Sequence, residues 1–226
     1  MRIITVSRQF GSGGRELGER LAEVLGWDYY DKQIIETLVE KHDLDEKYVR
    51  EVLSRHGWHQ VQLNYQLTYR NSFSHLLGHQ GMNAMTRLLQ RQSEIIKEIA
   101  QAGNDSVIVG RDADVILHDY HPFRILVCAD LESRLERCLQ HEERHAPEER
   151  LSEKEIRKNI RIIDKKRVHT REILTGKRRD DSSSFDLVVN ASGRDLSKLA
   201  CALKEFSLHW FEDGKNEEQQ DTGITD

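Results

Sequence analysis

The 226-residue chain contains few of the residues that characterise several large protein classes. With only two prolines, it should be dominated by regular secondary structure rather than by proline-rich linkers. Its three cysteines, Cys128, Cys138 and Cys201, form no CxxC pair, so a zinc ribbon or a disulfide framework is not expected. Buried thiols in a reducing cytoplasm are the expectation instead.

Long apolar runs and an excess of positive charge are also missing. No apolar stretch approaches membrane-spanning length, so we expect no membrane partner. The net charge of −5 argues against general binding of nucleic acid polymers. The chain begins directly with an apolar strand-like segment, which predicts a cytoplasmic protein without a signal peptide.

The most informative stretch that is present runs from Ile3 to Leu25. It opens with a β-branched run typical of a buried strand, continues through a glycine-rich segment, and ends in a segment with helical apolar spacing. Glycines allow a loop to turn its backbone N–H groups inward, and the following helix adds the positive end of its dipole. The stretch therefore predicts an anion site, most often one for phosphate, although a glycine turn without a ligand is the simpler alternative.

Two phosphate-binding designs compete for this loop. A dinucleotide fingerprint, G-x-G-x-x-G, fits Gly11 and Gly13 but requires glycine where the chain has Glu16. A nucleoside-triphosphate loop, G-x-x-x-x-G-K-[ST], fits the longer connection after the strand but lacks its lysine and hydroxyl. We favour the second design, in the register that places Arg15 at the lysine position; the other register places Gly14 there. The predicted donor-binding residues are Gly11, Ser12, Gly13, Gly14, Arg15 and Glu16.

Further strand-like runs lie near residues 28, 107, 124 and 186, each followed by a helical segment. This alternation predicts a three-layer α/β fold with a mostly parallel five-stranded sheet. We expect one domain over 1–211 and a flexible polar tail over 212–226, with the last helix ending at Phe211. The domain divides into a core (1–31, 101–143 and 183–211), a helical region (32–100) and a lid region (144–182).

Two groups of charged side chains are candidate ligand-binding residues. Arg111 and Asp112 come directly after a strand, at the sheet edge where ligands bind in parallel α/β folds. Asp164, Arg167 and Arg171 are spaced by three and four residues and share one helix face, from which they could close over a polyphosphate. The structural alternatives are a local ion pair and a solvated helix face. The histidines at 56, 59, 75 and 79 suggest no metal site.

Taken together, these motifs resemble the cytidylate kinase-like family of P-loop nucleoside monophosphate kinase relatives. The resemblance is carried by the stretches SRQFGSGGRELGERLAEVLGWDYYD, VIVGRDADVIL, RILVCADLESRLERC, IDKKRVHTREILTGK and FDLVVNAS. It implies a P-loop kinase fold with a helical acceptor-binding insertion and an arginine-bearing lid. ATP and Mg²⁺ are the implied cofactors, and a small phosphorylated acceptor is the implied partner.

Position by position, the resemblance assigns the donor phosphates to the glycine loop and the acceptor to Asp31, Arg111 and Asp112. It assigns catalytic roles to four residues, which are Arg15, Asp164, Arg167 and Arg171. The chain departs from true cytidylate kinases after its second strand, where D-S-G-x-x-Y-R is replaced by Asp31 followed by Lys32-Gln33-Ile34-Ile35-Glu36-Thr37. Loss of that arginine predicts weak activity on CMP.

The sequence therefore predicts a phosphotransferase that moves the ATP γ-phosphate to a small acceptor, with CMP or dCMP the first candidates. A nucleotide-binding regulatory protein with an altered loop and little transfer activity is the alternative. A nicotinamide-dependent enzyme is a weaker one, disfavoured by Glu16.

Overall fold

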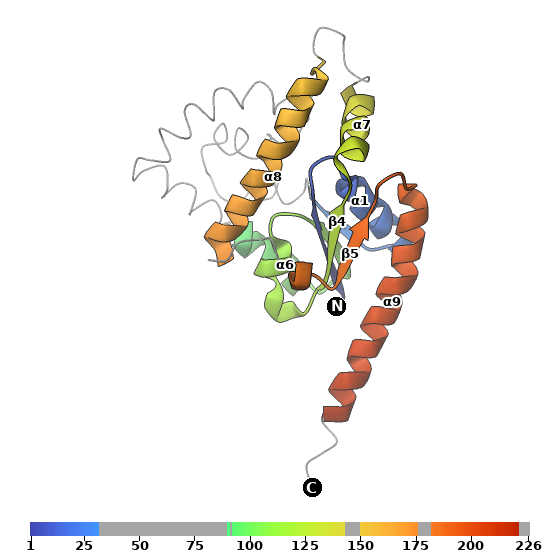
Figure 1. The fold of residues 1–226 in the computed structure, drawn as a ribbon. Coiled ribbons are helices and arrows are strands. Elements are labelled where there is room, and N and C mark those ends of the chain that lie inside the picture. The colour runs from blue at the N-terminus through green and yellow to red at the C-terminus, as the bar shows by residue number, and fades with distance from the viewer. Residues whose placement is uncertain (32–89, 91, 143–149, 176–181, 222–226) are drawn as a thin grey trace.

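A computed structural model describes residues 1–31, 90, 92–142, 150–175 and 182–221 of the chain (Figure 1). Its centre is a five-stranded sheet with the order β2-β3-β1-β4-β5. The strands are β1 (Ile3–Arg8), β2 (Asp28–Tyr30), β3 (Ser106–Val109), β4 (Phe123–Cys128) and β5 (Leu187–Asn190). Every pairing is parallel, which confirms the predicted fold class.

The central strands are buried on both faces, as expected for a parallel sheet covered by helices. All four residues of β3 are buried, and only the last residue of β1 is partly exposed. Val6 of β1 lies opposite Val109 of β3 on one side and Ile125 of β4 on the other. This register brings the carboxyl ends of β1 and β3 to the same rim of the sheet.

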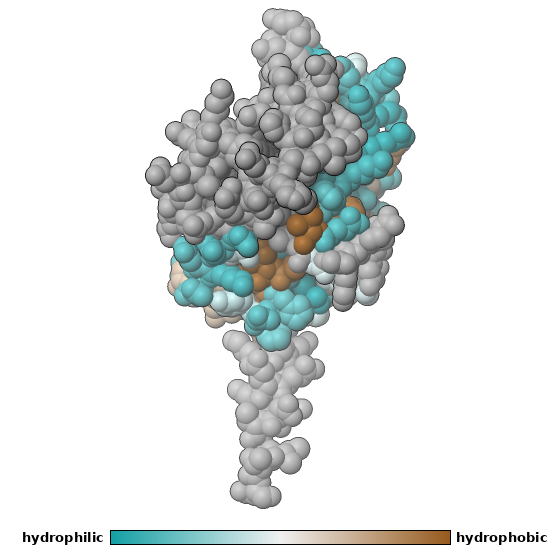
Figure 2. Space-filling view, turned by 90° about the vertical axis from the view of Figure 1, so that its left-hand side faces the viewer, coloured by the Kyte–Doolittle hydropathy of each residue, from teal (hydrophilic) through white to brown (hydrophobic). Residues whose placement is uncertain are grey.

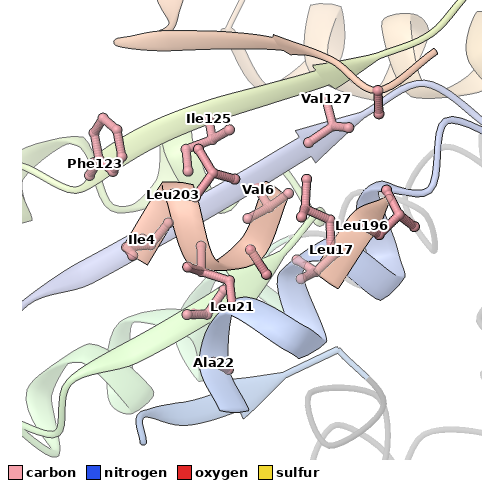
Figure 3. Close-up of a cluster of buried hydrophobic side chains, with 14 residues drawn as sticks. Ile4, Val6, Leu17, Leu21, Ala22, Phe123, Ile125, Val127, Leu196 and Leu203 are labelled. Carbon is pink, nitrogen blue, oxygen red and sulfur yellow. The ribbon is translucent and has the colours of Figure 1, made fainter. Parts of the chain in front are cut away.

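One face of the sheet is covered by α1 (Gly14–Leu25) and α9 (Leu196–Asp221). Figure 3 shows Leu17 and Leu21 of α1 and Leu203 of α9 pointing at the apolar side chains of the strands. Leu21 is fully excluded from water, and burial of such a side chain contributes about 1.5–3 kcal/mol to folding. This cluster fixes the start of α1, and with it the end of the glycine loop.

The other face carries a second apolar cluster, formed by the helical residues 92–101 and the short helix α6 (Ala113–Ile116). A 3₁₀ turn, η2 (His118–Tyr120), follows α6, and another, η4 (Ser182–Ser184), precedes β5. A third cluster joins α7 (Leu131–Glu142) to α8 (Glu153–Thr175) and includes Phe10 from the glycine loop. On the side of the molecule viewed in Figure 2, the described surface is mostly hydrophilic with a small apolar area.

The start of α8 is capped, and the end of α9 differs from the sequence expectation. Ser152 and Glu155 form a capping box, in which the Ser152 backbone N–H donates to Glu155 Oε2 (2.8 Å). The last helix continues to Asp221 instead of ending at Phe211, so residues 212–221, expected in the tail, are helical. Glu and Gln, which fill much of this segment, are strong helix formers, and this propensity favours the longer helix.

Several sequence expectations lie outside the described residues. These are most of the helical region 32–100, including the histidines at 56, 59, 75 and 79, and the parts of the lid region at 143–149 and 176–181. Among the helices that are described, none is both long enough and apolar enough to cross a membrane.

Candidate functional site

The glycine loop links β1 to α1 through backbone conformations that favour glycine. Gly11 and Gly13 have φ angles of 78° and 83°, in the left-handed region, and Gly13 is the residue that precedes α1. Space is equally restricted, since a Cβ on Gly11 would lie 2.9 Å from the Arg134 carbonyl oxygen and 3.0 Å from Cys138 Sγ. The loop is therefore a close-packed turn whose conformation and neighbours both require glycine.

Side chains from α7 and α8 hold the start of this loop through its backbone. Arg134 Nε donates to the Phe10 carbonyl oxygen (2.6 Å), and the Phe10 N–H donates to Asp164 Oδ1 (2.8 Å). Arg134 and Asp164 also form a close ion pair with each other. Arg167 Nη1 donates to the Arg8 carbonyl oxygen (2.8 Å). Two of the predicted lid residues, Asp164 and Arg167, thus contact the loop itself in this structure.

The second half of the loop is tied to β4, β5 and α7. Ser12 Oγ donates to the Gln9 carbonyl oxygen (2.9 Å), and the Ser12 carbonyl oxygen accepts from Arg137 Nη1 (3.2 Å). Arg137 also donates to the carbonyl oxygen of Ala191, just after β5. Gln9 Oε1 accepts from the Ala129 N–H (3.1 Å). These bonds fix the loop before any ligand arrives, as phosphate recognition by backbone groups requires.

The turn after β3 is unusual because two successive non-glycine residues are left-handed. Arg111 has a φ of 60° and Asp112 a φ of 52°. Such conformations cost on the order of 1–3 kcal/mol each and are concentrated at functional sites. Gln92 Nε2 donates to the Arg111 carbonyl oxygen (3.2 Å), which helps to hold this turn.

The Arg111 side chain points into a charged environment. Its Nη2 atom is buried and has no hydrogen-bond partner among the described residues. Burial lowers the pKa of its guanidinium to about 10, an effect that the charge of Arg8 reinforces and the charges of Asp31 and Asp112 oppose. Arg8, Asp31, Arg111 and Asp112 therefore lie close enough to influence one another, as expected for residues at the ends of β1, β2 and β3.

The third lid residue, Arg171, forms a buried ion pair that the sequence did not predict. Its Nη1 lies 2.5 Å from Asp114 Oδ2 and 3.9 Å from Asp112 Oδ1. The Arg171 and Asp114 side chains are only 8% and 2% exposed, and Ser7 Oγ donates to Asp114 Oδ1 (3.4 Å). Arg171 therefore connects α8 to α6 and to the turn that carries Asp112.

The two charged residues at the start of α1 contact other side chains in this structure. Arg15 Nε lies 3.1 Å from Asp31 Oδ2, which places this arginine beside the end of β2 with 59% of its side chain exposed. Glu16 accepts from Arg20 one helical turn further on, at an exposed position. The structure thus brings Arg15 to the predicted acceptor residue Asp31, and leaves Glu16 on the solvent side of α1.

Sequence reasoning missed three residues at this rim, which are Arg8, Asp114 and Arg134. Arg8 lies between the apolar strand and the first loop glycine, and this position could have identified it as a candidate site residue. Asp114 follows the recognised Arg111-Asp112 pair by two residues. Arg134 is buried because it binds the loop through the Phe10 carbonyl oxygen. Its partner Asp164 is 30 residues away, and no local pattern indicates that pairing.

The described residues do not form a ready-made Mg²⁺ site. They contain no group of three His, Cys, Asp or Glu side chains that could hold a metal ion. Of the three carboxylates at this rim, Asp31 pairs with Arg15 and Asp114 pairs with Arg171, and Asp112 lies 3.9 Å from the same Arg171 guanidinium. A hydroxyl after the loop glycines, which would normally bind the metal, is also missing. Among the described residues, the donor set does not fit a protein-held Mg²⁺ ion.

Comparisons with known proteins agree with this geometry. A protein of uncharacterised function from Eubacterium ventriosum has a TM-score of 0.63 and 19% identity over 92% of this chain and 98% of its own. The protein TT1252 from Thermus thermophilus has a TM-score of 0.52 and 17% identity over 92% and 97%. A shikimate kinase from Bacteroides thetaiotaomicron reaches 0.49 with 12% identity over 91% and 97%. The first two show a shared fold.

No curated protein matches the chain by sequence. The model of the cytidylate kinase-like family, however, matches residues 3–193, which include the glycine loop, the turn after β3 and the whole of α8. That match covers far more than half of the sequence and confirms the resemblance drawn from the motifs. The chain belongs to the cytidylate kinase-like family.

Proposed function

We propose that this protein transfers the γ-phosphoryl group of ATP to a small acceptor, with CMP and dCMP as the first candidates. The observation that carries the proposal is the convergence of the left-handed glycine loop with Arg111, Asp31 and Arg15 at one rim of the sheet. In a parallel α/β sheet this rim is where ligands bind. The loop suits the donor phosphates, and the charged residues suit an acceptor.

In the proposed reaction, an oxygen of the acceptor phosphate attacks the γ-phosphorus, and the bond to the bridging oxygen of ADP breaks. The protein contributes position and charge, without a covalent intermediate. The loop N–H groups and the start of α1 would hold donor oxygens. Arg111 would bind the acceptor phosphate, while Asp31 orients Arg15 beside it.

In the proposed reaction, the lid residues Arg167 and Arg171 can bind the donor only if they exchange their present hydrogen-bond partners. Arg167 binds the loop backbone, and Arg171 binds Asp114. Gripping the donor would require their guanidinium groups to exchange these protein oxygens for phosphate oxygens as charge develops in the transition state. Asp164 would act by holding the loop through Phe10.

A second function is favoured by the same contacts. In this alternative, α8 keeps its hydrogen bonds to the loop. The protein then binds a nucleotide and acts as a regulator without transferring phosphate. The absence of the motif lysine and hydroxyl from the sequence supports this regulatory alternative.

The experiment is a thermal-shift panel of nucleotides with and without Mg²⁺, followed by initial rates with CMP, dCMP, UMP and AMP at saturating Mg-ATP. We expect ATP to raise Tm and CMP or dCMP to be turned over with a high KM. Arg111→Ala should raise the KM for the acceptor about ten- to a hundredfold, as expected for a lost charge-assisted pair. Arg20→Ala, at an exposed site on α1, is the matched control.

Each outcome separates the alternatives. ATP binding without turnover of any acceptor supports the regulatory function. Efficient CMP turnover that survives Arg111→Ala contradicts the assigned role of Arg111. Protection by dinucleotides but not by ATP would contradict both functions.

A further inference from the structure

The glycine loop needs a positive charge that neither register of its motif supplies. In one register the lysine position is Gly14, which has no side chain. In the other it is Arg15, whose guanidinium lies beside Asp31 and is largely exposed. Backbone N–H groups alone leave most of the charge of a polyphosphate uncompensated, so another cation is expected at this rim.

Arg8 is positioned to be that cation. Its side chain leaves the end of β1 and crosses the first residue of α1, where a Cβ on Gly14 would lie 2.5 Å from Arg8 Cβ. Its guanidinium packs against Gly110, the residue that follows β3. A Cβ added to Gly110 would lie 1.4 Å from Arg8 Nη1 and 2.5 Å from Arg8 Cζ. Two glycines from different elements therefore leave the space that this one side chain occupies.

Two further contacts fix the base of Arg8. Its carbonyl oxygen accepts from Arg167 Nη1 of α8, and the neighbouring Phe10 is held by Asp164. The backbone, the stem and the head of Arg8 are thus positioned by α8, α1 and β3 respectively. A surface arginine that only solubilises the chain has no need of such restraint.

The register of the sheet places Arg8 next to Arg111. Val6 pairs with Val109, and Arg8 and Arg111 each follow their paired residue by two positions. The two positive charges act on each other, because Arg8 contributes to lowering the pKa of Arg111. The carboxylates of Asp31 and Asp112 offset part of the repulsion between the two guanidinium groups. The buried Nη2 of Arg111 nevertheless has no hydrogen-bond partner among the described residues, so it can still donate to an anion.

We propose that Arg8, together with Arg111, binds the phosphoryl group at the end of the glycine loop, in place of the missing lysine. Two guanidinium forks can each donate two parallel hydrogen bonds to phosphate oxygens. Arg8 lies on the donor side of the rim, and Arg111 lies on the predicted acceptor side. The ligand that both arginines bind is therefore the phosphoryl group that moves from the donor to the acceptor. The inference rests on the proposed function and adds a residue to it.

The test uses isothermal titration of the full chain with inorganic tripolyphosphate and, separately, with Mg-ATP. We expect Arg8→Met to weaken both about ten- to a hundredfold and Arg8→Lys to restore part of the loss, because charge returns without the fork. Arg20→Met, an exposed arginine on the neighbouring helix, should change neither affinity. Circular dichroism and Tm establish that each variant is folded.

A second pair of variants moves the Arg8 guanidinium without removing its charge. Gly110→Ala places a methyl group where Arg8 Nη1 lies, at a φ of 77°. Gly26→Ala introduces the same left-handed strain at a φ of 68°, but its Cβ would meet nothing within 4 Å. Both should lower Tm by a similar amount, and only Gly110→Ala should weaken tripolyphosphate binding.

The outcomes distinguish this inference from the proposed function. Tripolyphosphate binding that Arg8→Met abolishes supports the inference even if the protein turns over no acceptor. Wild-type turnover with an unchanged Mg-ATP affinity in Arg8→Met overturns the inference and leaves the phosphotransferase intact. Failure of the wild-type protein to bind tripolyphosphate also overturns it.

Discussion

The glycine loop after β1 and the turn after β3 lie side by side at the ends of paired strands, and both use left-handed backbone. The loop reaches that conformation with Gly11 and Gly13, which adopt it without steric cost. The turn reaches it with Arg111 and Asp112, which do not. The loop thus packs its backbone into a small space, whereas the turn adopts a strained backbone that places two charged side chains at the rim.

The two regions are also held in different ways. Side chains from α7 and α8 bind the backbone of the loop, through Arg134, Asp164 and Arg167. The turn is held through side-chain charges, chiefly by the buried contact of Arg171 with Asp114. Substitutions that remove a charge should therefore affect the turn most, and substitutions that add volume should affect the loop most.

The largest effect should come from Asp114→Ala. Among the described residues, this substitution leaves only the more distant Asp112 to compensate the buried Arg171 guanidinium, and breaking such a pair costs about 3–5 kcal/mol. Urea denaturation measures the change in the free energy of unfolding. Arg157→Ala, which removes ion pairs to the exposed Glu132 and Glu153, should change it by about 1 kcal/mol or less.

The double variant Asp114→Ala/Arg171→Met sharpens this test. Removing both charges leaves neither member of the pair buried without the other, so the double variant should be more stable than the single variant Asp114→Ala. A loss in Asp114→Ala no larger than that in Arg157→Ala would mean that the turn is not held by this charge.

A smaller effect is expected when volume is added to α1. In Gly14→Ala the new Cβ would lie 2.5 Å from Arg8 Cβ, and in Gly18→Ala it would lie 2.5 Å from Val109 Cγ2. Overpacking of this kind costs about 1–3 kcal/mol, partly offset by the higher helix propensity of alanine. Both variants should therefore lose stability in thermal or urea denaturation.

Of the two substituted glycines, only Gly14 adjoins the loop. Gly14→Ala displaces Arg8, so it should also weaken ATP binding, whereas Gly18→Ala perturbs the core beneath the sheet and should not. Equal ATP affinities in the two variants would show that the shape of the loop at Gly14 is irrelevant to the ligand.

The smallest effect concerns the thiol beneath the loop. Burial raises the pKa of Cys138 to about 12, and its Sγ lies next to Gly11. At pH 8 we expect iodoacetamide to modify the exposed Cys201 and to spare Cys138 until the protein unfolds. Mass spectrometry of peptides after timed labelling measures both rates, and equal rates would mean that the loop does not shield Cys138.

The same thiol gives a pH dependence of defined sign. Between its ordinary pKa of 9.0 and about 12, Cys138 keeps its proton in the folded chain and loses it in the unfolded chain. The unfolded state then binds fewer protons, so the stability contributed by this group falls as the pH rises through that window. Cys138→Ala should remove this part of the pH dependence in urea titrations between pH 8.5 and about 10.5.

The sequence by itself determined the sheet, because short runs such as Ile3–Val6 and Phe123–Ala129 are mostly apolar and rich in β-branched or aromatic residues, which favours buried strands. It also determined the place of the glycine loop and of the turn after β3, since strand ends in a parallel sheet share one rim. The helix propensity of residues 212–221 favours the observed end of α9 at Asp221, whereas their polar, unpatterned composition predicted a tail.

Only the tertiary structure decided what each charged side chain contacts. Helical periodicity placed Asp164, Arg167 and Arg171 on one face, and in the fold they face Arg134, the Arg8 carbonyl oxygen and Asp114. Arg15 contacts Asp31 rather than the loop, and Arg8 reaches Gly110. Local spacing fixes which side of an element a residue occupies. Its partner comes from packing between segments up to 159 residues apart, which no local pattern encodes.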